Sequence, residues 1–189
     1  LPTFVLFAAC ASTAYAQEVV GGDPSAAGEW PDAAAILDAS GTVFCSGTLI
    51  TDSLVLSAGH CSGRAKTIIL DSHNLSQNLG ITRKIRRTWQ YPDYLNTLDI
   101  AVFELDEAVS IAPRALAVTC VADNYIADDA SVQIVGFGAT DVDGIDFPQA
   151  LMQASTLMLD ATCATPERDC NASVYPWGEL IAGGGGVDS

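Results

Sequence analysis

The sequence predicts an all-β protein, and three observations lead to that class. Short apolar runs recur along the chain, and several are rich in β-branched residues. Gly, Asp, Asn, Ser and Pro separate the runs, as at residues 38–41 and 141–144. Few long stretches have the 3.6-residue period of an amphipathic helix. Many short strands joined by frequent turns are typical of a β-sandwich or barrel. The runs lie at 33–37, 54–56, 68–70, 100–103 and 132–135.

The composition fits a folded, acidic protein. The chain has 189 residues, of which 49% are hydrophobic, too apolar a content for a disordered protein. Its formal net charge is −15, from 8 Lys and Arg against 23 Asp and Glu. Such a surface repels nucleic acid and anionic lipid, so we expect neither a nucleic-acid partner nor a membrane partner.

The N-terminal segment predicts export. Residues 4–11 form an apolar run that is too short to span a bilayer. Ala14 and Ala16 are small residues at the two positions that signal peptidase reads, which predicts cleavage before Gln17. We therefore expect residues 1–16 to be a signal peptide, incomplete at its start, followed by a propeptide at 17–18 and a secreted domain at 19–189.

Two alternatives to the signal peptide remain open. The apolar run could be a buried strand near the terminus. Cys10 could instead be the lipidated cysteine of a bacterial lipoprotein, although Phe7 is a poor residue at the third position before it. We favour soluble export.

The cysteine pattern fits export better than metal binding. Removal of the signal peptide leaves five cysteines, an odd number that indicates a missing partner or a free thiol. No two cysteines have the C-x-x-C spacing of a zinc site, and the chain has only 2 histidines. We therefore expect no structural metal and no cofactor. The six cysteines are Cys10, Cys45, Cys61, Cys120, Cys163 and Cys170.

His60 is the first candidate for chemistry. The apolar run 54–56 ends in small residues, which His60 and Cys61 follow. A disulfide from Cys61 to Cys45 would close a hairpin-sized loop, would contribute about 3 kcal/mol in the chain-entropy model, and would fix the backbone beside the histidine. A general base must be held within hydrogen-bonding distance of its target, so such a histidine suits that role. The alternative is a surface histidine beside an ordinary structural disulfide.

Asp99 is the second candidate. It stands at the start of the apolar run 100–103, which predicts a buried strand. A buried carboxylate needs a partner, and an imidazole N–H would serve and would fix the tautomer that leaves the other ring nitrogen free as a base. An aspartate that caps the turn before the strand is the alternative, and without His60 we would prefer it.

These two residues belong to a series of motifs that resembles the trypsin/chymotrypsin family of serine proteases. The first segment begins at Val19, and five further segments follow it in the family's order and at about its spacing. The resemblance covers residues 19–189. The matching segments are Val19 to Gly22, Gly28 to Pro31, Cys45 to Ile50, Ser57 to Cys61, Asp99 to Leu105 and Gly136 to Gly138.

The resemblance implies a fold and an activity. The fold is two antiparallel six-stranded β-barrels of the trypsin-like kind with the active site between them; we expect the first at about 19–110 and an incomplete second at about 111–189. The activity is hydrolysis of peptide bonds through an acyl-enzyme. Protein or peptide substrates are the implied partners, and protein inhibitors are another class. The competing hypothesis is a non-catalytic homologue that acts as a binding or scaffolding module.

The resemblance also assigns roles to individual residues. His60 matches the general base, and Asp99 matches the buried carboxylate that orients it. Asp188, followed by Ser189, matches the acidic floor of the pocket that accepts Arg or Lys in trypsin-like members. Val19 matches the mature amino terminus, which a route other than tryptic cleavage should expose because Glu18 precedes it.

Several departures from the family pattern bear on these roles. The segment with the nucleophilic serine should follow Ser189, so we expect this chain to be a fragment without that serine and inactive by itself. Ile181 stands where many members have a cysteine, so Cys163 is expected to pair with Cys170. Gly59 replaces the commoner alanine before the histidine, a change that we expect to be tolerated.

Overall fold

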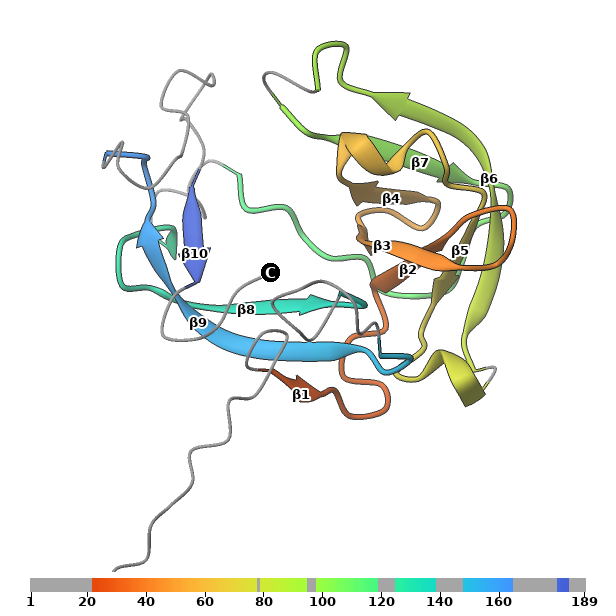
Figure 1. Cartoon of the computed structure of the whole chain (residues 1–189), viewed down its shortest axis with the longest axis horizontal. Coiled ribbons are helices and arrows are strands. Elements are labelled where there is room, and N and C mark those ends of the chain that lie inside the picture. Colours follow the sequence, from red (N-terminus) through yellow and green to blue (C-terminus); the bar gives the residue numbers. More distant parts are fainter. Residues whose placement is uncertain are drawn as a thin grey trace, which may run out of the picture.

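The structure is a computed structural model that describes residues 22–77, 79–94, 98–118, 125–138, 148–164 and 180–183. It is mostly β, and its strands form a closed barrel and a separate open sheet (Figure 1). The strands are β1 (Asp23–Pro24), β2 (Ala33–Leu37), β3 (Val43–Leu49), β4 (Leu54–Ser57), β5 (Thr67–Leu70), β6 (Ile81–Gln90), β7 (Ala101–Leu105), β8 (Ser131–Gly136), β9 (Met152–Asp160) and β10 (Ile181–Gly183). Two short 3₁₀ turns, η1 (Gly59–Cys61) and η2 (Leu75–Gln77), complete the set.

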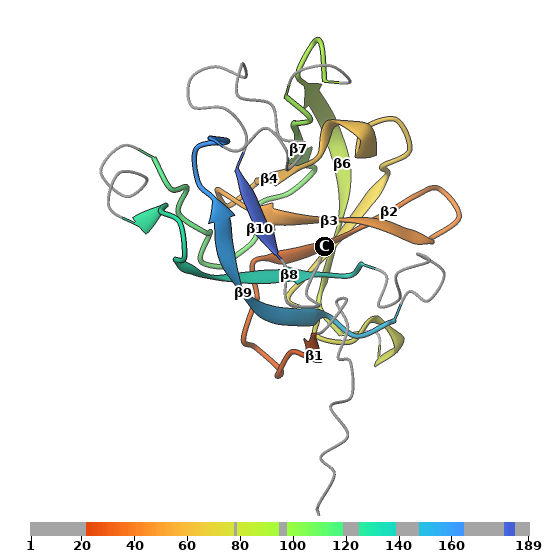
Figure 2. The same cartoon turned by 60° about the vertical axis from the view of Figure 1, so that its left-hand side comes forward.

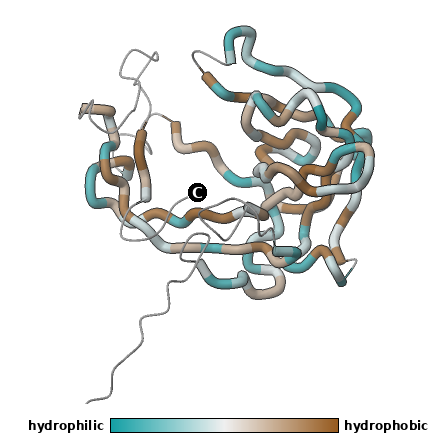
Figure 3. Tube along the Cα trace, in the orientation of Figure 1, coloured by the Kyte–Doolittle hydropathy of each residue, from teal (hydrophilic) through white to brown (hydrophobic). Residues whose placement is uncertain are grey.

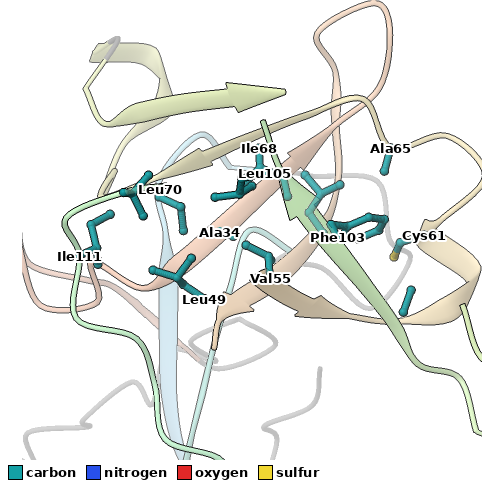
Figure 4. Close-up of a cluster of buried hydrophobic side chains, with 13 residues drawn as sticks. Ala34, Leu49, Val55, Cys61, Ala65, Ile68, Leu70, Phe103, Leu105 and Ile111 are labelled. Atoms are coloured by element: carbon teal, nitrogen blue, oxygen red, sulfur yellow. The ribbon is translucent and has the colours of Figure 1, made fainter. Parts of the chain in front are cut away.

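The first half of the chain closes into a six-stranded antiparallel barrel. Its strand order is β2-β3-β4-β7-β6-β5, and β5 pairs with β2 to close it. Large side chains that are fully buried fill its interior, among them Phe103, Leu49 and Ile68 (Figure 4). The expected first barrel is therefore confirmed in its architecture.

Strand β2 explains why one apolar run does not alternate with polar residues. All five of its residues are buried. Ala34 and Ile36 belong to the barrel core, whereas Ala33, Ala35 and Leu37 pack in a second cluster with Phe137 and Leu151, which directly follow β8 and precede β9 of the other sheet. A strand covered on both faces needs apolar residues at every position. β6 is the contrast: it is mostly hydrophilic (Figure 3), and its last five residues are exposed.

The second sheet is organised around the long strand β9. β8 pairs with one edge of β9, and β1 and β10 pair with the other edge (Figure 2). Within the described residues this sheet has four strands and is open. The two barrels are expected to divide at about residue 110. The strand pairing differs in one respect, because β1 at residues 23–24 pairs with β9 of the second sheet. The chain before β2 turns at residues 27–29, and it lies near β9 because Ala33 of β2 packs in the same cluster as Leu151.

An ion pair ties the segment after β7 to the start of β2. Both carboxylate oxygens of Asp32, which is 5% exposed, accept hydrogen bonds from the Arg114 guanidinium at 2.7 Å. This hydrogen bonding outweighs burial and raises the pKa of Arg114. The guanidinium also lies over the Trp30 ring, 5.0 Å from its centroid. The bidentate pair helps to fix how the chain leaves the barrel for the second sheet.

In the part of the chain that the structure describes, no helix is long and apolar enough to cross a membrane. The expected signal peptide, Val19, Asp188 and Ser189 lie outside the described residues.

Candidate active site

The barrel topology brings His60 and Asp99 together. β4 and β7 are antiparallel, and Ser57 at the end of β4 is paired with Ala101 at the start of β7. His60 lies three residues beyond Ser57, in η1, and Asp99 lies two residues before Ala101. Because antiparallel neighbours end and begin at the same edge, residues 39 apart in the sequence become spatial neighbours.

Asp99 holds His60 with both carboxylate oxygens. The Nδ1 atom of His60 lies 2.6 Å from Oδ2 of Asp99, and the backbone N–H of His60 donates to Oδ1 at 2.8 Å. Two contacts to one carboxylate fix both the ring and the backbone of the histidine. An ionised carboxylate only accepts hydrogen bonds, so Nδ1 carries the proton and Nε2 is left unprotonated in the neutral ring.

The expectation that Asp99 is buried is wrong in this structure. Its side chain is 46% exposed, and that of His60 is 61% exposed. The physical reason is position, because Asp99 precedes β7 at the rim of the barrel and does not lie inside it. Such burial as there is acts to raise the pKa of Asp99, but the hydrogen bonds from the side chain and backbone of His60 outweigh it and lower that pKa. Asp99 is therefore ionised at neutral pH.

A disulfide lies beside the pair. Cys45 in β3 is bonded to Cys61, the residue after His60, with a Cα–Cα distance of 6.3 Å. Cys61 is 2% exposed and packs into the barrel core, so it anchors η1 to the interior. The Sγ atoms of both cysteines and a ring nitrogen of His60 lie within 4.8 Å of one another. Because the sulfurs are bonded to each other, they are not the thiolates that metal ions bind.

Two residues that the sequence did not single out support the turn that carries His60. The Gln90 side chain donates from Nε2 to the carbonyl oxygen of Gly59 at 2.9 Å. A Cβ atom added at Gly59 would lie 2.8 Å from Cβ of Tyr94 and 3.0 Å from Oδ1 of Asp99. Gly59 therefore leaves the space in which Tyr94 and Asp99 approach the turn.

We expect Gly59→Ala to destabilise the fold by about 1–3 kcal/mol, because Tyr94 or Asp99 must move to admit the new methyl group. The displaced carboxylate should also weaken the bond to Nδ1 of His60. Thermal unfolding measures the first effect, and the NMR resonance of the Nδ1 proton measures the second. Gly63→Ala is the matched control: a Cβ at Gly63 meets nothing within 4 Å. Equal stability of the two variants would contradict the prediction.

A pocket of about 730 Å³ opens beside His60. The barrel supplies most of its wall, and the segments that flank the second sheet supply the rest. Its lining residues are Gly41, Thr42, Val43, Phe44, Cys45, His60, Arg64, Phe137, Pro148 and Gln149. A histidine with one free ring nitrogen at the edge of a pocket of this size can exchange a proton with a bound molecule.

Ser46 joins the two halves at this pocket. Its Oγ accepts a hydrogen bond from the backbone N–H of Phe137 at 2.8 Å, and its carbonyl accepts one from the Ser57 hydroxyl at 2.7 Å. The first bond holds the residue after β8 against β3, the strand that carries Cys45, and the second joins β4 to β3. The first bond joins residues 91 apart, and no local sequence signal predicts such a contact.

The other predicted site residues, apart from Cys163, lie outside the described residues. Cys163 is in a disulfide, but Cys170, its expected partner, is not among the described residues. The same holds for Val19, Asp188 and Ser189. Of the predicted site residues, the structure brings His60, Asp99, Cys45 and Cys61 together.

Comparisons with known proteins agree with this geometry. The family model Trypsin matches residues 19–179. Chymotrypsin-like elastase family member 1 of Canis lupus familiaris is 30% identical over 190 residues, which cover 90% of this chain and 70% of the elastase. A trypsin of Saccharopolyspora erythraea is 27% identical over 152 residues, covering 77% of this chain and 66% of that trypsin.

Solved structures show the same fold. Neuropsin, a serine protease of mouse brain, superposes with a TM-score of 0.69 at 23% identity and covers 87% of this chain and 74% of its own. The secreted serine protease VesC of Vibrio cholerae gives a TM-score of 0.60 at 24% identity, with coverages of 74% and 31%. The family match over most of the length places this chain in the trypsin-like serine protease family.

Proposed function

We propose that this chain carries the general base and its orienting carboxylate for a secreted serine endopeptidase. His60 is the base, Asp99 is the carboxylate, and a serine outside the described residues is the nucleophile. The observation that carries the proposal is the double hydrogen bond of Asp99 to the ring and backbone of His60, at 2.6 and 2.8 Å.

The geometry supports a specific sequence of proton transfers. Nε2 of His60 lies at the pocket, and among its described neighbours Cys45 Sγ stands 4.0 Å away. As a base, Nε2 takes the proton of the serine hydroxyl while the serine oxygen bonds to the substrate carbonyl carbon. The imidazolium then gives that proton to the leaving amine as the peptide C–N bond breaks. Water repeats the exchange to free the acyl group.

Asp99 makes the first transfer easier without taking a proton itself. Its lowered pKa keeps it ionised, so it stabilises the imidazolium that forms beside it. The Asp99 side chain is partly exposed, so solvent screens its attraction to the imidazolium and limits this stabilisation. A substrate that covers the pair would exclude water and strengthen it.

Secretion, specificity and activation complete the proposal. The Cys45–Cys61 disulfide supports an oxidising compartment, as outside the cell. We propose cleavage after Arg or Lys, with Asp188 at the floor of the specificity pocket, and a mature amino terminus at Val19. The relatives include elastases as well as a trypsin, so the specificity needs its own test.

Labelling by a fluorophosphonate probe tests the proposal, because such probes react with a serine that a base has activated. The protein expressed from its complete coding sequence should be labelled and should hydrolyse fluorogenic peptides. His60→Ala should reduce both by more than about a thousandfold. His73→Ala, which changes the other of the 2 histidines, is the matched control and should keep both. A folded protein without labelling or turnover would be a non-catalytic homologue, and the proposal would fail.

A further inference from the structure

The pocket beside His60 has a positively charged side chain in its wall. Among the described residues that line it, Arg64 is the one with a permanent charge, and none of these residues is a carboxylate. The whole chain has a net charge of −15, which by itself disfavours acidic substrates. Arg64 therefore places a guanidinium on the wall of a pocket in an otherwise acidic protein, with Asp38 as its ion-pair partner.

Arg64 is held in place from two sides. Its Nη2 atom donates to Oδ2 of Asp38 at 2.8 Å, and its guanidinium lies over the Phe44 ring, 4.6 Å from the centroid. Phe44 is itself a wall residue of the pocket. Stacking and ion pairing together restrict a long side chain that is otherwise 65% exposed.

Asp38 is suited to hold the arginine without moving. Its other oxygen, Oδ1, accepts hydrogen bonds from the Ser40 hydroxyl at 2.6 Å and from the backbone N–H groups of Ser40 and Thr42 at 2.9 and 3.1 Å. The hydrogen bonds from Ser40 and Arg64 hold the pKa of Asp38 well below its usual range. The loop between β2 and β3 is thus a fixed, ionised support for Arg64.

A guanidinium has five N–H donors, and Asp38 receives one of those of Arg64. A second carboxylate can therefore bind the open edge of the guanidinium without displacing the first. Arg64 and His60 line the same pocket, so a side chain bound by Arg64 belongs to a residue near the bond that His60 acts on.

We propose that Arg64 is a specificity-determining residue that selects peptides with Asp or Glu beside the cleaved bond. This inference rests on the proposed function, because it concerns the substrate of the same site. The preference is expected to be about fivefold to tenfold over the neutral amide, since the pair is partly exposed and screened.

Binding tests this preference separately from turnover. The probes are fluorescein-labelled peptides with a central Arg. In each pair of peptides, one of the two positions on either side of this Arg holds Glu in one peptide and Gln in the other. Fluorescence anisotropy measures their Kd on the complete protein with Asp99→Asn, a background that slows cleavage and leaves every lining residue of the pocket in place. At one position, the Glu peptide should bind about fivefold to tenfold more tightly than the Gln peptide, and this preference should fall as ionic strength rises.

Two further variants assign the preference to Arg64. Arg64→Gln should remove it, and Arg64→Lys should retain part of it because the charge remains. Lys66→Gln is the matched control, since it removes one positive charge two residues away and does not line the pocket. If Arg64→Gln does not fold, the comparison of Arg64→Lys with Lys66→Gln replaces it.

Each result bears on one claim. Equal Kd values for the Glu and Gln peptides at every position would overturn the role of Arg64, and so would an equal loss of preference in Lys66→Gln. Hydrolysis by the protein with Asp99 intact is measured in parallel. Its absence would contradict the proposed function, while the Glu preference would still decide the role of Arg64.

Discussion

Replacing Asp99 with asparagine is expected to lower kcat about 10,000-fold, the loss that this substitution causes in a related serine protease. The side-chain amide can still accept from the backbone N–H of His60 through its oxygen. Its NH₂ group then faces Nδ1 and donates to it, so the ring proton moves to Nε2. A histidine protonated at Nε2 cannot take the proton of the serine, although its position is unchanged.

Steady-state kinetics on a peptide substrate measure the effect, with Asp52→Asn as the control. Asp52 lies in the turn between β3 and β4, where its side chain accepts a hydrogen bond from the Ser53 hydroxyl. That variant should keep full activity. A loss smaller than about tenfold in Asp99→Asn would mean that His60 does not depend on Asp99 for its tautomer.

Acid unfolding gives a second readout of the same carboxylate. The pKa of folded Asp99 lies below its ordinary value near 3.9, so the unfolded chain takes up this proton at higher pH than the folded one. Its contribution to stability is therefore complete above about pH 4 and is lost as the pH falls through the folded pKa. Asp99→Asn should flatten the fall in Tm over this acid range, whereas Asp52→Asn should not.

Much of the barrel could be predicted because its strands are apolar. The runs at 33–37, 54–56 and 68–70 coincide with β2, β4 and β5 or lie inside them, and 100–103 overlaps β7. β2, β5 and β7 each bury at least one whole face, and β4 buries Val55, so their apolar residues stand out in the sequence. β6 is different: it lies outside the barrel core along much of its length and carries polar residues that give no such mark.

The long strand β9 was missed for another reason. Its residues alternate in burial, but Thr156 and Asp160 are among the inward ones, at 7% and 2% exposed. The carboxylate of Asp160 accepts hydrogen bonds from the backbone N–H groups of Ala164 at 2.9 Å and Thr162 at 3.3 Å, which compensate its burial. Polar residues on the buried face hide the two-residue period from an analysis based on hydropathy. In the structure, β9 is identified by its antiparallel pairing with β1, β8 and β10.

The candidate site was predictable in its chemical groups and not in its supports. His60 and Asp99 stand in motifs whose residue types suit a base and its partner. The contacts of Gln90, Tyr94 and Ser46 depend on how distant segments pack, and no local pattern encodes them. The exposure of Asp99 could not be predicted for the same reason, because its motif does not encode which other segments cover its side chain.

The primary specificity offers the second large effect. The complete enzyme is expected to cleave after Arg and Lys, with kcat/KM for Arg at least about a thousandfold above that for Phe. The reason is Asp188, which the family resemblance places at the floor of the pocket and which lies outside the described residues. A carboxylate there gains a charge-assisted hydrogen bond from a guanidinium, bidentate in the best geometry. A Phe side chain would leave that charge desolvated and unpaired, which costs several kcal/mol.

Asp188→Ser should remove the preference because it removes the buried charge while leaving a small polar side chain. Activity on a peptide with Phe at the cleaved position should persist, since His60 and Asp99 are untouched, so the loss is confined to Arg and Lys peptides. Profiling on a peptide library measures this, with Asp52→Ser as a control for removing one carboxylate from an acidic chain. The elastase relatives make the opposite result informative. A dominant preference for Phe, Tyr or Leu in the unsubstituted enzyme would place Asp188 outside the pocket, with its carboxylate in solvent.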